Sequence, residues 1–291
     1  MRALRIHAYG GPEVMRLDEV PVPRAGAGER RVKLVAASVN PIDWKMRHGL
    51  MSGRLPRILG RDGAGVDPAT GERVLGIGSL GRDGTHAEYA VFSEAACAPI
   101  PANTSFEQAA ALGIAGLSAW IALVENAAVQ PGQRVLVHAG AGGVGSFAIQ
   151  IARLHGAEVW TTCSARNADW CRALGAHHAI DYANEDFTAG GARFDVVLDT
   201  LGGTVHERSA AVLKPGGVLT YLNAAPVHSV ARPDVRVLPS EVHATPERLA
   251  RLLGLGFHVP VESRFPLDRG AAAYELSRTG HARGKIVLQI P

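Results

Sequence analysis

The chain has 291 residues, a length that suits two domains better than one. Charged residues make up 20% and hydrophobic residues 47%, and the formal net charge is only +3. The basic residues are dispersed, so we expect no nucleic-acid partner. We see no apolar run of membrane-spanning length and no signal-peptide core, which predicts no membrane association and a cytoplasmic location. The three cysteines form no C-x-x-C pair, which argues against a disulfide framework and a four-cysteine zinc site.

The chain begins with a strand-rich part and continues with alternating strands and helices. Strands are predicted over 3–7, 31–37 and 87–92, and helices over 106–112 and 117–126. Beyond Arg134, a repeated strand–helix pattern predicts a parallel sheet covered on both faces, with strands at 135–138, 158–163, 179–182, 195–199 and 218–222 and helices at 144–155 and 169–174. A last strand over 284–290 returns to the first part. The predicted fold class is α/β, with a doubly wound parallel sheet beside a β-rich domain.

The motif that carries most information is Gly140-Ala141-Gly142-Gly143-Val144-Gly145. It has the form G-x-G-x-x-G, directly follows a predicted strand and opens a predicted helix, which is the setting of a dinucleotide-binding loop. Glycine permits a tight turn and close approach of backbone N–H groups to a diphosphate, and the helix N-terminus adds partial positive charge. The alternative is a glycine-rich turn without a ligand.

The end of the following strand distinguishes NAD from NADP. NAD sites usually place an acidic residue there to bind the ribose 2′-hydroxyl, and this strand tip has none. Ser164, Arg166 and Asn167 offer hydroxyl, guanidinium and amide donors, which suit a 2′-phosphate. We therefore favour NADP(H). The alternative is that Arg166 and Asn167 only cap the next helix.

With these residues in view, the chain resembles the medium-chain dehydrogenase/reductase superfamily, in its zinc-independent quinone and enone oxidoreductase branch. The resemblance runs nearly end to end and implies a GroES-like catalytic domain from both chain ends, 1–116 and 255–291, with a Rossmann domain at 117–254. It also implies that Ser164 and Tyr182 help to hold the 2′-phosphate. Besides the glycine loop, the matching stretches are Tyr9-Gly10-Gly11-Pro12-Glu13-Val14, Ser38-Val39-Asn40-Pro41-Ile42-Asp43-Trp44-Lys45, Gly60-Arg61-Asp62-Gly63-Ala64-Gly65-Val66, Gly113-Ile114-Ala115-Gly116-Leu117-Ser118-Ala119-Trp120, Leu174-Gly175-Ala176 and Gly284-Lys285-Ile286-Val287-Leu288.

Two features depart from the zinc-containing relatives and from the usual family length. Gly60-Arg61-Asp62 stands where those relatives have Gly-His-Glu, and Asn40 lies where their ligand cysteine is found, so we expect no metal. The turn after Val66 is short, and so is the stretch 221–249. Both put the substrate range and the oligomeric state in doubt.

Hydride transfer requires a donor that stabilises negative charge developing on the substrate carbonyl oxygen. Lys45 is our first candidate, because a half-buried lysine can act as an acid. Its alternative is a solvated lysine or one paired with Asp43 or Asp62. Asn40 is a candidate for orienting the carbonyl or the nicotinamide ribose, against an Asx turn before Pro41.

Further cofactor contacts are expected along the sheet edge and at the domain junction. Thr200 and Leu201 follow a strand at its carboxyl end, where ligands dock in such sheets. Asn223 follows the last strand of the alternating region, close to the expected nicotinamide. Ser118 resembles a hydroxyl on the phosphate side of the nicotinamide, and Lys285 is considered for a cofactor phosphate, against a surface lysine.

The sequence thus predicts an NADPH-dependent reductase of a small conjugated carbonyl compound or quinone. An enoyl-thioester or biosynthetic tailoring reductase is the enzymatic alternative. An NADPH-binding sensor or structural protein without turnover is the alternative of another class. The expected partner is a small-molecule substrate, and a homodimer is considered for the assembly.

Overall fold

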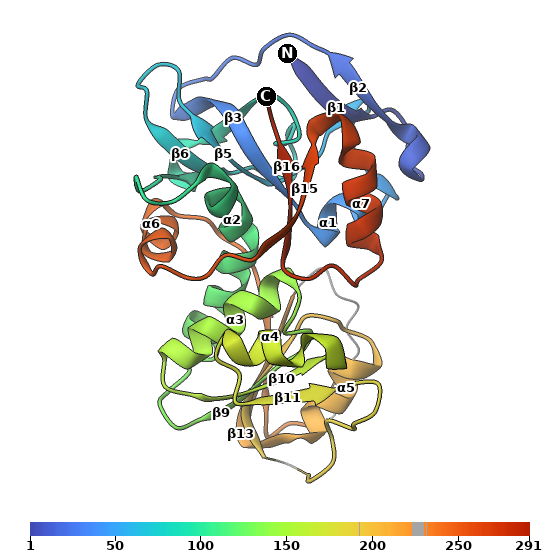
Figure 1. Cartoon of the computed structure of the whole chain (residues 1–291), viewed down its shortest axis with the longest axis vertical. Helices are drawn as coiled ribbons and strands as arrows, with labels where there is room; N and C mark the ends of the chain where they lie inside the picture. Colours follow the sequence, from blue (N-terminus) through green and yellow to red (C-terminus); the bar gives the residue numbers. More distant parts are fainter. Residues whose placement is uncertain (192, 223–229, 231) are drawn as a thin grey trace. The chain divides into compact units, whose positions relative to one another are not determined.

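The computed structural model describes residues 1–191, 193–222, 230 and 232–291, and Asn223 lies outside this described part. The chain divides into two compact units, Met1–Leu117 with His243–Pro291 and Ser118–Val242. Both chain ends belong to the first unit, as the N and C marks in Figure 1 show. A β-rich unit built from both ends and a middle unit of alternating strands and helices match the predicted fold class.

The β-rich unit is organised around a seven-stranded sheet. Its strand order is β15-β16-β3-β5-β6-β8. The seventh strand, β7, pairs with the N-terminal half of β3. A separate three-stranded sheet has the order β2-β1-β4. The strands of this unit are β1 (Arg2–Ile6), β2 (Met15–Glu19), β3 (Glu29–Val39), β4 (Arg57–Ile58), β5 (Asp62–Val66), β6 (Arg73–Ile77), β7 (Tyr89–Ser93), β8 (Cys97–Pro99), β15 (Val261–Pro266) and β16 (Lys285–Gln289).

The short turn after Val66 closes a regular hairpin. Strands β5 and β6 pair antiparallel from Asp62 opposite Ile77 to Val66 opposite Arg73. The Asp67 carboxylate accepts from the backbone N–H of Ala69, and the Asp67 carbonyl accepts from the Gly71 N–H. This Asx-type turn explains how so few residues connect the two strands.

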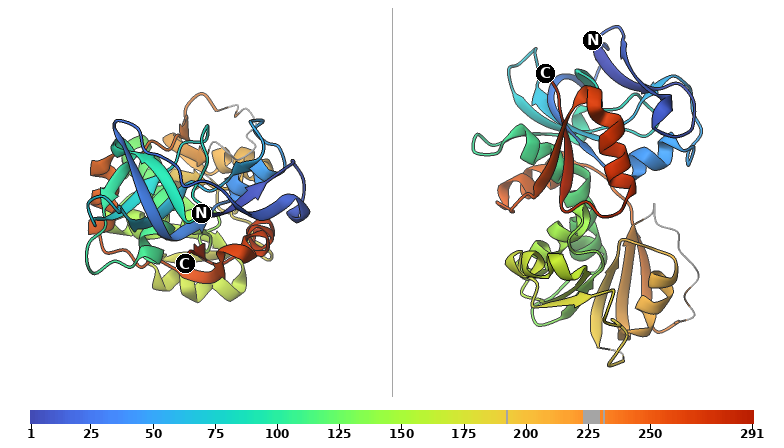
Figure 2. Two further views of the ribbon diagram at one scale, coloured as in Figure 1. Left: turned by 90° about the horizontal axis from the view of Figure 1, so that it is seen from above. Right: turned by 45° about the vertical axis from the view of Figure 1, so that its right-hand side comes forward.

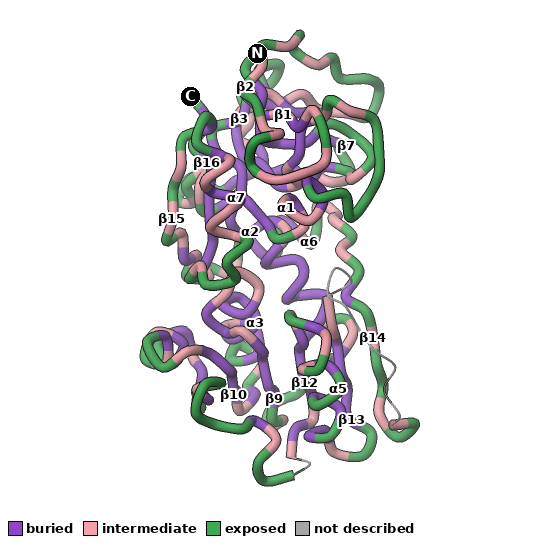
Figure 3. The backbone as a smooth tube through the Cα atoms, turned by 90° about the vertical axis from the view of Figure 1, so that its right-hand side faces the viewer, coloured by how far each residue is buried: buried purple, intermediate pink, exposed green. Residues whose placement is uncertain are grey.

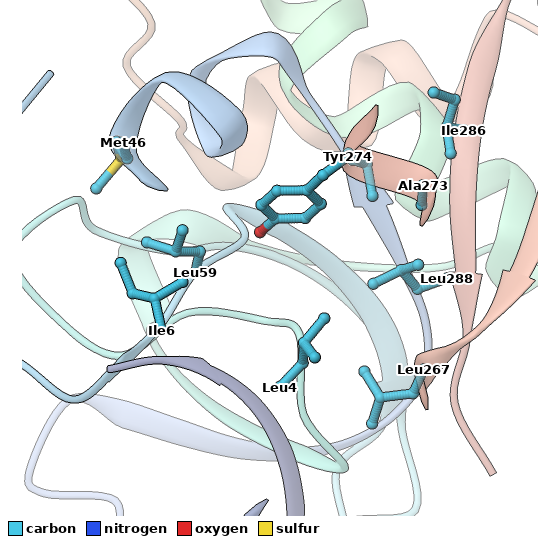
Figure 4. Close-up of a cluster of buried hydrophobic side chains, with 10 residues drawn as sticks. Leu4, Ile6, Met46, Leu59, Leu267, Ala273, Tyr274, Ile286 and Leu288 are labelled. Atoms are coloured by element: carbon cyan, nitrogen blue, oxygen red, sulfur yellow. The ribbon is translucent and has the colours of Figure 1, made fainter. Parts of the chain in front are cut away.

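Helices α1 (Pro41–Arg47) and α7 (Gly270–Arg278) pack against each other in the same unit. Figure 4 shows the core beneath them, where the ring of Tyr274 lies among aliphatic side chains. Tyr274 and Leu288 are fully buried, and Leu4 and Ile6 come from the first strand. The last strand is therefore an integral part of this core, as the predicted return of 284–290 required.

The middle unit is a six-stranded sheet in which every pair is parallel. Its order is β11-β10-β9-β12-β13-β14, the arrangement of a Rossmann dinucleotide-binding fold. Figure 2 shows α3 and α4 on one side of the sheet and α5 on the other. The bounds are β9 (Arg134–Val137), α3 (Gly143–Leu154), β10 (Glu158–Cys163), α4 (Ala168–Ala173), β11 (His178–Asp181), β12 (Phe194–Asp199), α5 (Thr204–Ala211), β13 (Leu213–Leu222) and β14 (Arg236–Ser240).

Burial follows the position of each strand in this sheet. The apolar residues of β9 and β12 are buried, because both strands lie in the middle and are covered on both faces. Edge strand β14 is mostly exposed, and Val237 retains 36% of its accessible surface. Figure 3 shows this contrast along the backbone.

One long helix replaces the two that were predicted over 106–112 and 117–126. Helix α2 (Phe106–Trp120) continues without a break into a π-helical turn, Ile121–Asn126. Contrary to expectation, this 21-residue helix is long and apolar enough to cross a membrane, but 83% of its most apolar window is buried inside the protein. It is therefore a core helix by its surroundings.

The second unit boundary lies at Val242/His243, twelve residues before the predicted 254/255. The difference is the segment that carries helix α6 (Pro246–Gly254). Its buried leucines Leu249, Leu252 and Leu253 give it an apolar face, and it packs on β8 of the β-rich unit. Because α6 buries its side chains there, it belongs to that unit.

Candidate cofactor and active site

The glycine loop connects β9 to the N-terminus of α3. Its tight turn lies one residue earlier than predicted, because the left-handed residue is Ala139, with φ of +52°, and none of the loop glycines has positive φ. Ala139 is held there by its N–H, which donates to Thr162 Oγ1 at 3.2 Å. The prediction that glycine supplies the turn was therefore wrong. The glycines serve close approach instead.

Two of these glycines have no space for a side chain. A Cβ on Gly140 would lie 1.9 Å from Thr161 Oγ1, and a Cβ on Gly145 would lie 2.2 Å from the Ala139 carbonyl oxygen. Strand β10 and helix α3 thus press directly against the loop backbone. The third role in the fingerprint, close helix–strand packing, falls to Gly145.

The first turn of α3 is the part of the loop suited to an anion. Gly142 is the N-cap and has extended backbone, and no side chain caps this helix end. Gly143 and Val144 are the first helical residues, and Ala141 before them is 8% exposed. The N-terminus of this 12-residue helix has no side-chain cap, so its first backbone N–H groups and the partial positive charge of the helix are directed outward. This arrangement fits a diphosphate.

A second turn lies beside this loop at the point where the strand order reverses. Strands β9 and β12 are neighbours, and each is followed on its carboxyl side by a loop. Thr200 Oγ1 donates to the carbonyl oxygen of His138 at 3.0 Å, which ties the two loops together. Leu201 is 49% exposed there, and its N–H donates to Asp199 Oδ1. Thr200 and Leu201 thus follow β12 at the carboxyl edge of the sheet, the edge at which sheets of this topology bind nucleotides.

The predicted 2′-phosphate residues meet at the ends of β10 and β11. Cys163 and Asp181 are partners in the parallel register, so Ser164 and Tyr182, one residue further on, leave the sheet side by side. Tyr182 is 57% exposed. Arg166 is exposed, and its guanidinium has no ion-pair or hydrogen-bond partner among the described residues.

Asn167 has a structural role at this tip. Its side chain is 9% exposed and donates to Ser164 Oγ at 3.1 Å. Ser164 is the N-cap of the short helical turn that precedes α4. Asn167 stands at the N-cap position of α4, as the alternative has it, but its side chain makes no capping hydrogen bond there. Ser164 keeps its hydroxyl proton for another acceptor.

In the β-rich unit, the predicted catalytic residues lie at the start of α1. Asn40 is the N-cap, and its N–H donates to Asp43 Oδ2 at 2.7 Å in a capping box. Burial raises the pKa of Asp43 to about 7. Lys45 is half-buried on the same helix, near the Trp44 ring, and desolvation lowers its pKa. A lysine whose pKa is lowered suits the proposed proton donor.

The side chain of Asn40 is engaged within the protein. Its amide oxygen accepts from Lys285 Nζ at 2.6 Å, and its amide nitrogen donates to Asp62 Oδ1 at 2.8 Å and to Ser38 Oγ at 3.3 Å. Asn40 is 5% exposed. Both amide protons and an oxygen lone pair are thus used, so this geometry gives Asn40 a structural role rather than direct contact with a carbonyl or ribose.

Lys285 is a buried residue of the β-rich unit. It is 3% exposed, and its ammonium donates to Asn40 and lies 3.5 Å from the Val39 carbonyl oxygen. Desolvation lowers its pKa, against the opposing effect of the Asp62 and Asp43 carboxylates. The alternative of a surface lysine was wrong.

The sequence did not reveal the hydrogen-bonded cluster around Asp62. Asp62 accepts from Ser38 Oγ at 2.6 Å and from the Ile114 N–H at 2.8 Å. His86 Nε2 lies 3.2 Å from the Ser38 carbonyl oxygen, which can only accept, so Nε2 carries the proton and Nδ1 accepts from the Tyr274 hydroxyl at 2.7 Å. Burial lowers the pKa of His86 to about 4, consistent with that neutral tautomer. The one signal for Asp62 was its place in Gly60-Arg61-Asp62, which we interpreted only as the absence of a ligand set.

Among the described residues, no group of three or more His, Cys, Asp or Glu side chains is arranged to hold a metal ion. Arg61, which stands where the zinc-containing relatives have a histidine, donates from Nε to the Gly78 carbonyl oxygen at 3.0 Å. Ser118, on α2, is 4% exposed, and its carbonyl oxygen accepts from Ser240 Oγ.

Comparisons with known proteins agree with this architecture. Residues 26–102 match the alcohol dehydrogenase GroES-like domain, and residues 174–288 match the zinc-binding dehydrogenase family. A quinone-oxidoreductase of Triphysaria versicolor is 30% identical, over 99% of this chain and 98% of its own. An NADPH-dependent alkenal/one oxidoreductase of Arabidopsis thaliana is 32% identical, over 99% and 79%. The Escherichia coli quinone oxidoreductase structure with NADPH is 28% identical, with a TM-score of 0.90 over 99% and 100%.

The fold and these matches define a medium-chain dehydrogenase/reductase with a GroES-like domain and a Rossmann domain. Within that superfamily, the chain belongs to the branch of quinone and alkenal/one oxidoreductases. The prediction of family and fold is confirmed, and the protein is an oxidoreductase.

Proposed function

We propose that this protein is an NADPH-dependent reductase of small α,β-unsaturated carbonyl compounds or quinones that works without zinc. The observation that carries the proposal is the glycine loop at the topological switch point, next to the ends of β10, followed by Ser164 and Arg166, and of β11, followed by Tyr182. Relatives described as NADPH-dependent, or seen with NADPH, support NADP(H) as the cofactor.

Different residues of the Rossmann unit would bind different parts of the dinucleotide. Backbone N–H groups of Gly143 and Val144 at the start of α3 would hold the diphosphate, while the Gly142 N–H donates to the Ala139 carbonyl oxygen at 2.9 Å and shapes the loop. Arg166 and Tyr182 would contact the 2′-phosphate, and the Ser164 hydroxyl would donate a hydrogen bond to a phosphate oxygen. When bound, the cofactor supplies a hydride to the substrate. Thr200 and Leu201 would border it at the crevice, and Asn223 and Ser118 remain proposed contacts near the nicotinamide.

Lys45 is proposed as the donor that stabilises charge on the substrate oxygen. A hydride that adds to the β-carbon of an enone leaves negative charge on the carbonyl oxygen, and a proton must then be added to complete the saturated product. An ammonium supplies both the stabilising charge and the proton. The lowered pKa of Lys45 brings its release of a proton closer to neutral pH. For a quinone, the same hydride and proton give the hydroquinone.

Independence from zinc is supported by the residues at the corresponding positions. The Asn40 amide nitrogen is hydrogen-bonded to the Asp62 carboxylate, and the Asn40 amide oxygen, which could otherwise face a metal, accepts from the ammonium of Lys285. Metal analysis of the purified protein by mass spectrometry, together with turnover after chelation, tests this part. Stoichiometric zinc required for activity would contradict it.

A panel of substrates tests the proposed reaction against its two alternatives. The panel contains short enals, ring enones, quinones and enoyl thioesters, and consumption of NADPH is followed for each. We expect turnover with an enal, enone or quinone. Selective turnover of an enoyl thioester would favour a biosynthetic reductase, and tight NADPH binding without turnover across the panel would favour a sensor or structural protein.

We also propose a cellular location and an assembly state for this protein. A cytoplasmic location accords with the 83% burial of the most apolar helix window, whereas some relatives are described as chloroplastic. A homodimer without nucleic-acid or membrane partners is proposed for the assembly. Light scattering coupled to size-exclusion chromatography measures the molecular mass in solution, and a monomer mass would rule out the dimer.

A further inference from the structure

We propose that Lys285 is a positioning residue of the active site, whose buried ammonium fixes Asn40 and thereby the start of the helix that carries Lys45. The inference rests on the proposed function for its kinetic test, but its structural basis lies entirely within the β-rich unit. Residues 245 positions apart meet here, because β16 pairs antiparallel with β3 and brings Ile286 opposite Val39. The last strand thus delivers Lys285 to the end of β3, directly beside Asn40.

Among the described residues, the ammonium of Lys285 has two hydrogen-bond acceptors. It is 3% exposed, and its hydrogen bonds are to the Asn40 amide oxygen at 2.6 Å and to the Val39 carbonyl oxygen at 3.5 Å. The Asn40 amide is oriented in turn by Asp62 and Ser38. With its oxygen committed to a cation and its nitrogen to a carboxylate, this amide has a single favourable orientation.

The orientation of Asn40 sets the start of α1. Asn40 is the N-cap, and its backbone N–H bonds to Asp43, the third residue of the helix. Lys45 lies two residues further on the same seven-residue helix. A displacement at the N-cap is therefore carried to Lys45 with little chance of relaxation, since Lys45 lies only five residues, about one and a half turns, beyond Asn40.

Charge balance gives the ammonium a second effect on the same residues. The buried carboxylates Asp43 and Asp62 are 1% and 0% exposed. Lys285 and Arg61 are the cations that act on the pKa of Asp43, while Asp62 opposes them. A neutral residue at position 285 would leave two buried carboxylates facing one guanidinium, which destabilises the ionised form of Asp43 that caps the Asn40 N–H.

The experiment compares K285M and K285R with the wild type in kcat, KM and the Kd of NADPH. Lys33→Met is the matched control, because Lys33 lies on β3 of the same unit and is exposed. A positioning role predicts that K285M lowers kcat by about 10- to 100-fold, as a misplaced catalytic group does, with NADPH Kd within about 2-fold. K285R keeps the charge and the donors, so it should recover part of the loss.

Two outcomes would overturn the inference. One is a folded K285M enzyme whose kcat stays within about 2-fold of the wild type. The other is NADPH Kd weakened by about 10-fold or more at unchanged kcat, which would make Lys285 a phosphate contact. Turnover of the wild type is measured first, so that its absence counts against the proposed reaction and not against Lys285.

A double-mutant cycle keeps the test decisive if K285M fails to fold. K285R and N40A are combined, and both kcat and the thermal unfolding midpoint are measured. If Lys285 acts through Asn40, K285R has a smaller effect on both quantities in the N40A background than in the wild type. Equal effects in the two backgrounds would show that Lys285 acts independently of Asn40, which contradicts the inference.

Discussion

Cys163 and Asp181 are register partners on the parallel strands β10 and β11, so the residues that follow them, Ser164 and Tyr182, emerge side by side at the edge of the sheet. This pairing brings together a hydroxyl-bearing residue and an exposed tyrosine, and the exposed Arg166 follows Ser164 by two residues in the chain. Three donors without an intervening acidic residue in the β10 tip are what a ribose 2′-phosphate requires.

The first prediction concerns this strand tip. Arg166→Ala should weaken NADPH binding by about 10- to 100-fold, since a charge-assisted hydrogen bond to a phosphate is worth roughly 1.5–3 kcal/mol. The Kd of NADH should stay unchanged, because NADH lacks the 2′-phosphate. Arg172→Ala is the control, since Arg172 is exposed on α4 and paired with Asp169. Equal weakening of both nucleotides would place Arg166 elsewhere on the cofactor.

The second prediction concerns the glycine loop. Gly145→Ala would place a Cβ 2.2 Å from a backbone oxygen that cannot move aside, so we expect a loss of about 1–3 kcal/mol in the free energy of unfolding and much weaker NADPH binding. Gly254→Ala is the matched control, because nothing lies within 4 Å of its Cβ position at the end of α6. Denaturant unfolding and fluorescence titration measure the two effects. A Gly145→Ala protein that matches the control in both would contradict the packing described here.

The third prediction concerns the proton donor. Lys45→Met should lower kcat by about 10²-fold or more with an enone substrate, while NADPH Kd changes little. In the wild type, activity should fall as pH rises through the pKa of Lys45, because a general acid works in its protonated form, and that limb should begin below 10.5. The limb should disappear in the Met variant. Full turnover of Lys45→Met would remove Lys45 as the acid without affecting the fold or the cofactor site.

The fourth prediction concerns Asp43 and stability. Its pKa is about 7 in the folded protein, against 3.8 for an unburied aspartate, so the folded state holds the extra proton between these values. This residue therefore lowers stability as pH rises from about 4 to about 7. Relative to the wild type, Asp43→Asn should gain up to about 4 kcal/mol in the free energy of unfolding over that range.

The measurement is urea unfolding of both proteins at several pH values. The difference between them is the informative quantity, because His86 and His138 have pKa values lowered to about 4 and change stability in the opposite sense with pH. Parallel pH profiles for the variant and the wild type would show that Asp43 does not titrate as a buried group.

Local pattern was enough to predict most of the Rossmann unit. The strand predicted at 158–163 is β10, and the helices predicted at 144–155 and 169–174 are displaced by one residue from α3 and α4. These elements have strong apolar periodicity and clear glycine or cap signals at their ends, and they contact mainly their sequence neighbours. The positions of these elements are therefore determined by the local amino-acid sequence.

Tertiary contacts overrode the local pattern elsewhere. The two helices predicted over 106–112 and 117–126 are one helix in the structure, and Gly113 between those ranges permits close packing, since a Cβ there would lie 2.7 Å from the Asp62 Cβ. Edge strand β14, by contrast, is mostly exposed and shows no apolar alternation, so its pairing with β13 decides its conformation. Neither feature has a signal within a short window of sequence.

In the candidate site, too, some features could be predicted from the local sequence and others could not. The glycine loop and the β10 tip were predicted because a dinucleotide site is carried by contiguous residues. The contact between Lys285 and Asn40 could not be predicted, because it depends on the antiparallel pairing of β16 with β3. The same holds for the neutral tautomer of His86, which is fixed by the Ser38 carbonyl oxygen on β3 and leaves Nδ1 to accept from Tyr274 on a distant helix.

Titration of the purified protein with NADPH and with NADH by calorimetry tests the central claim most directly. We expect one molecule of NADPH to bind per chain, about 10-fold or more tighter than NADH, because the backbone of the glycine loop holds the diphosphate and the β10 tip adds contacts to the 2′-phosphate. Tighter binding of NADH would contradict the assignment of the strand tip. Failure of both nucleotides to bind would contradict the oxidoreductase function itself.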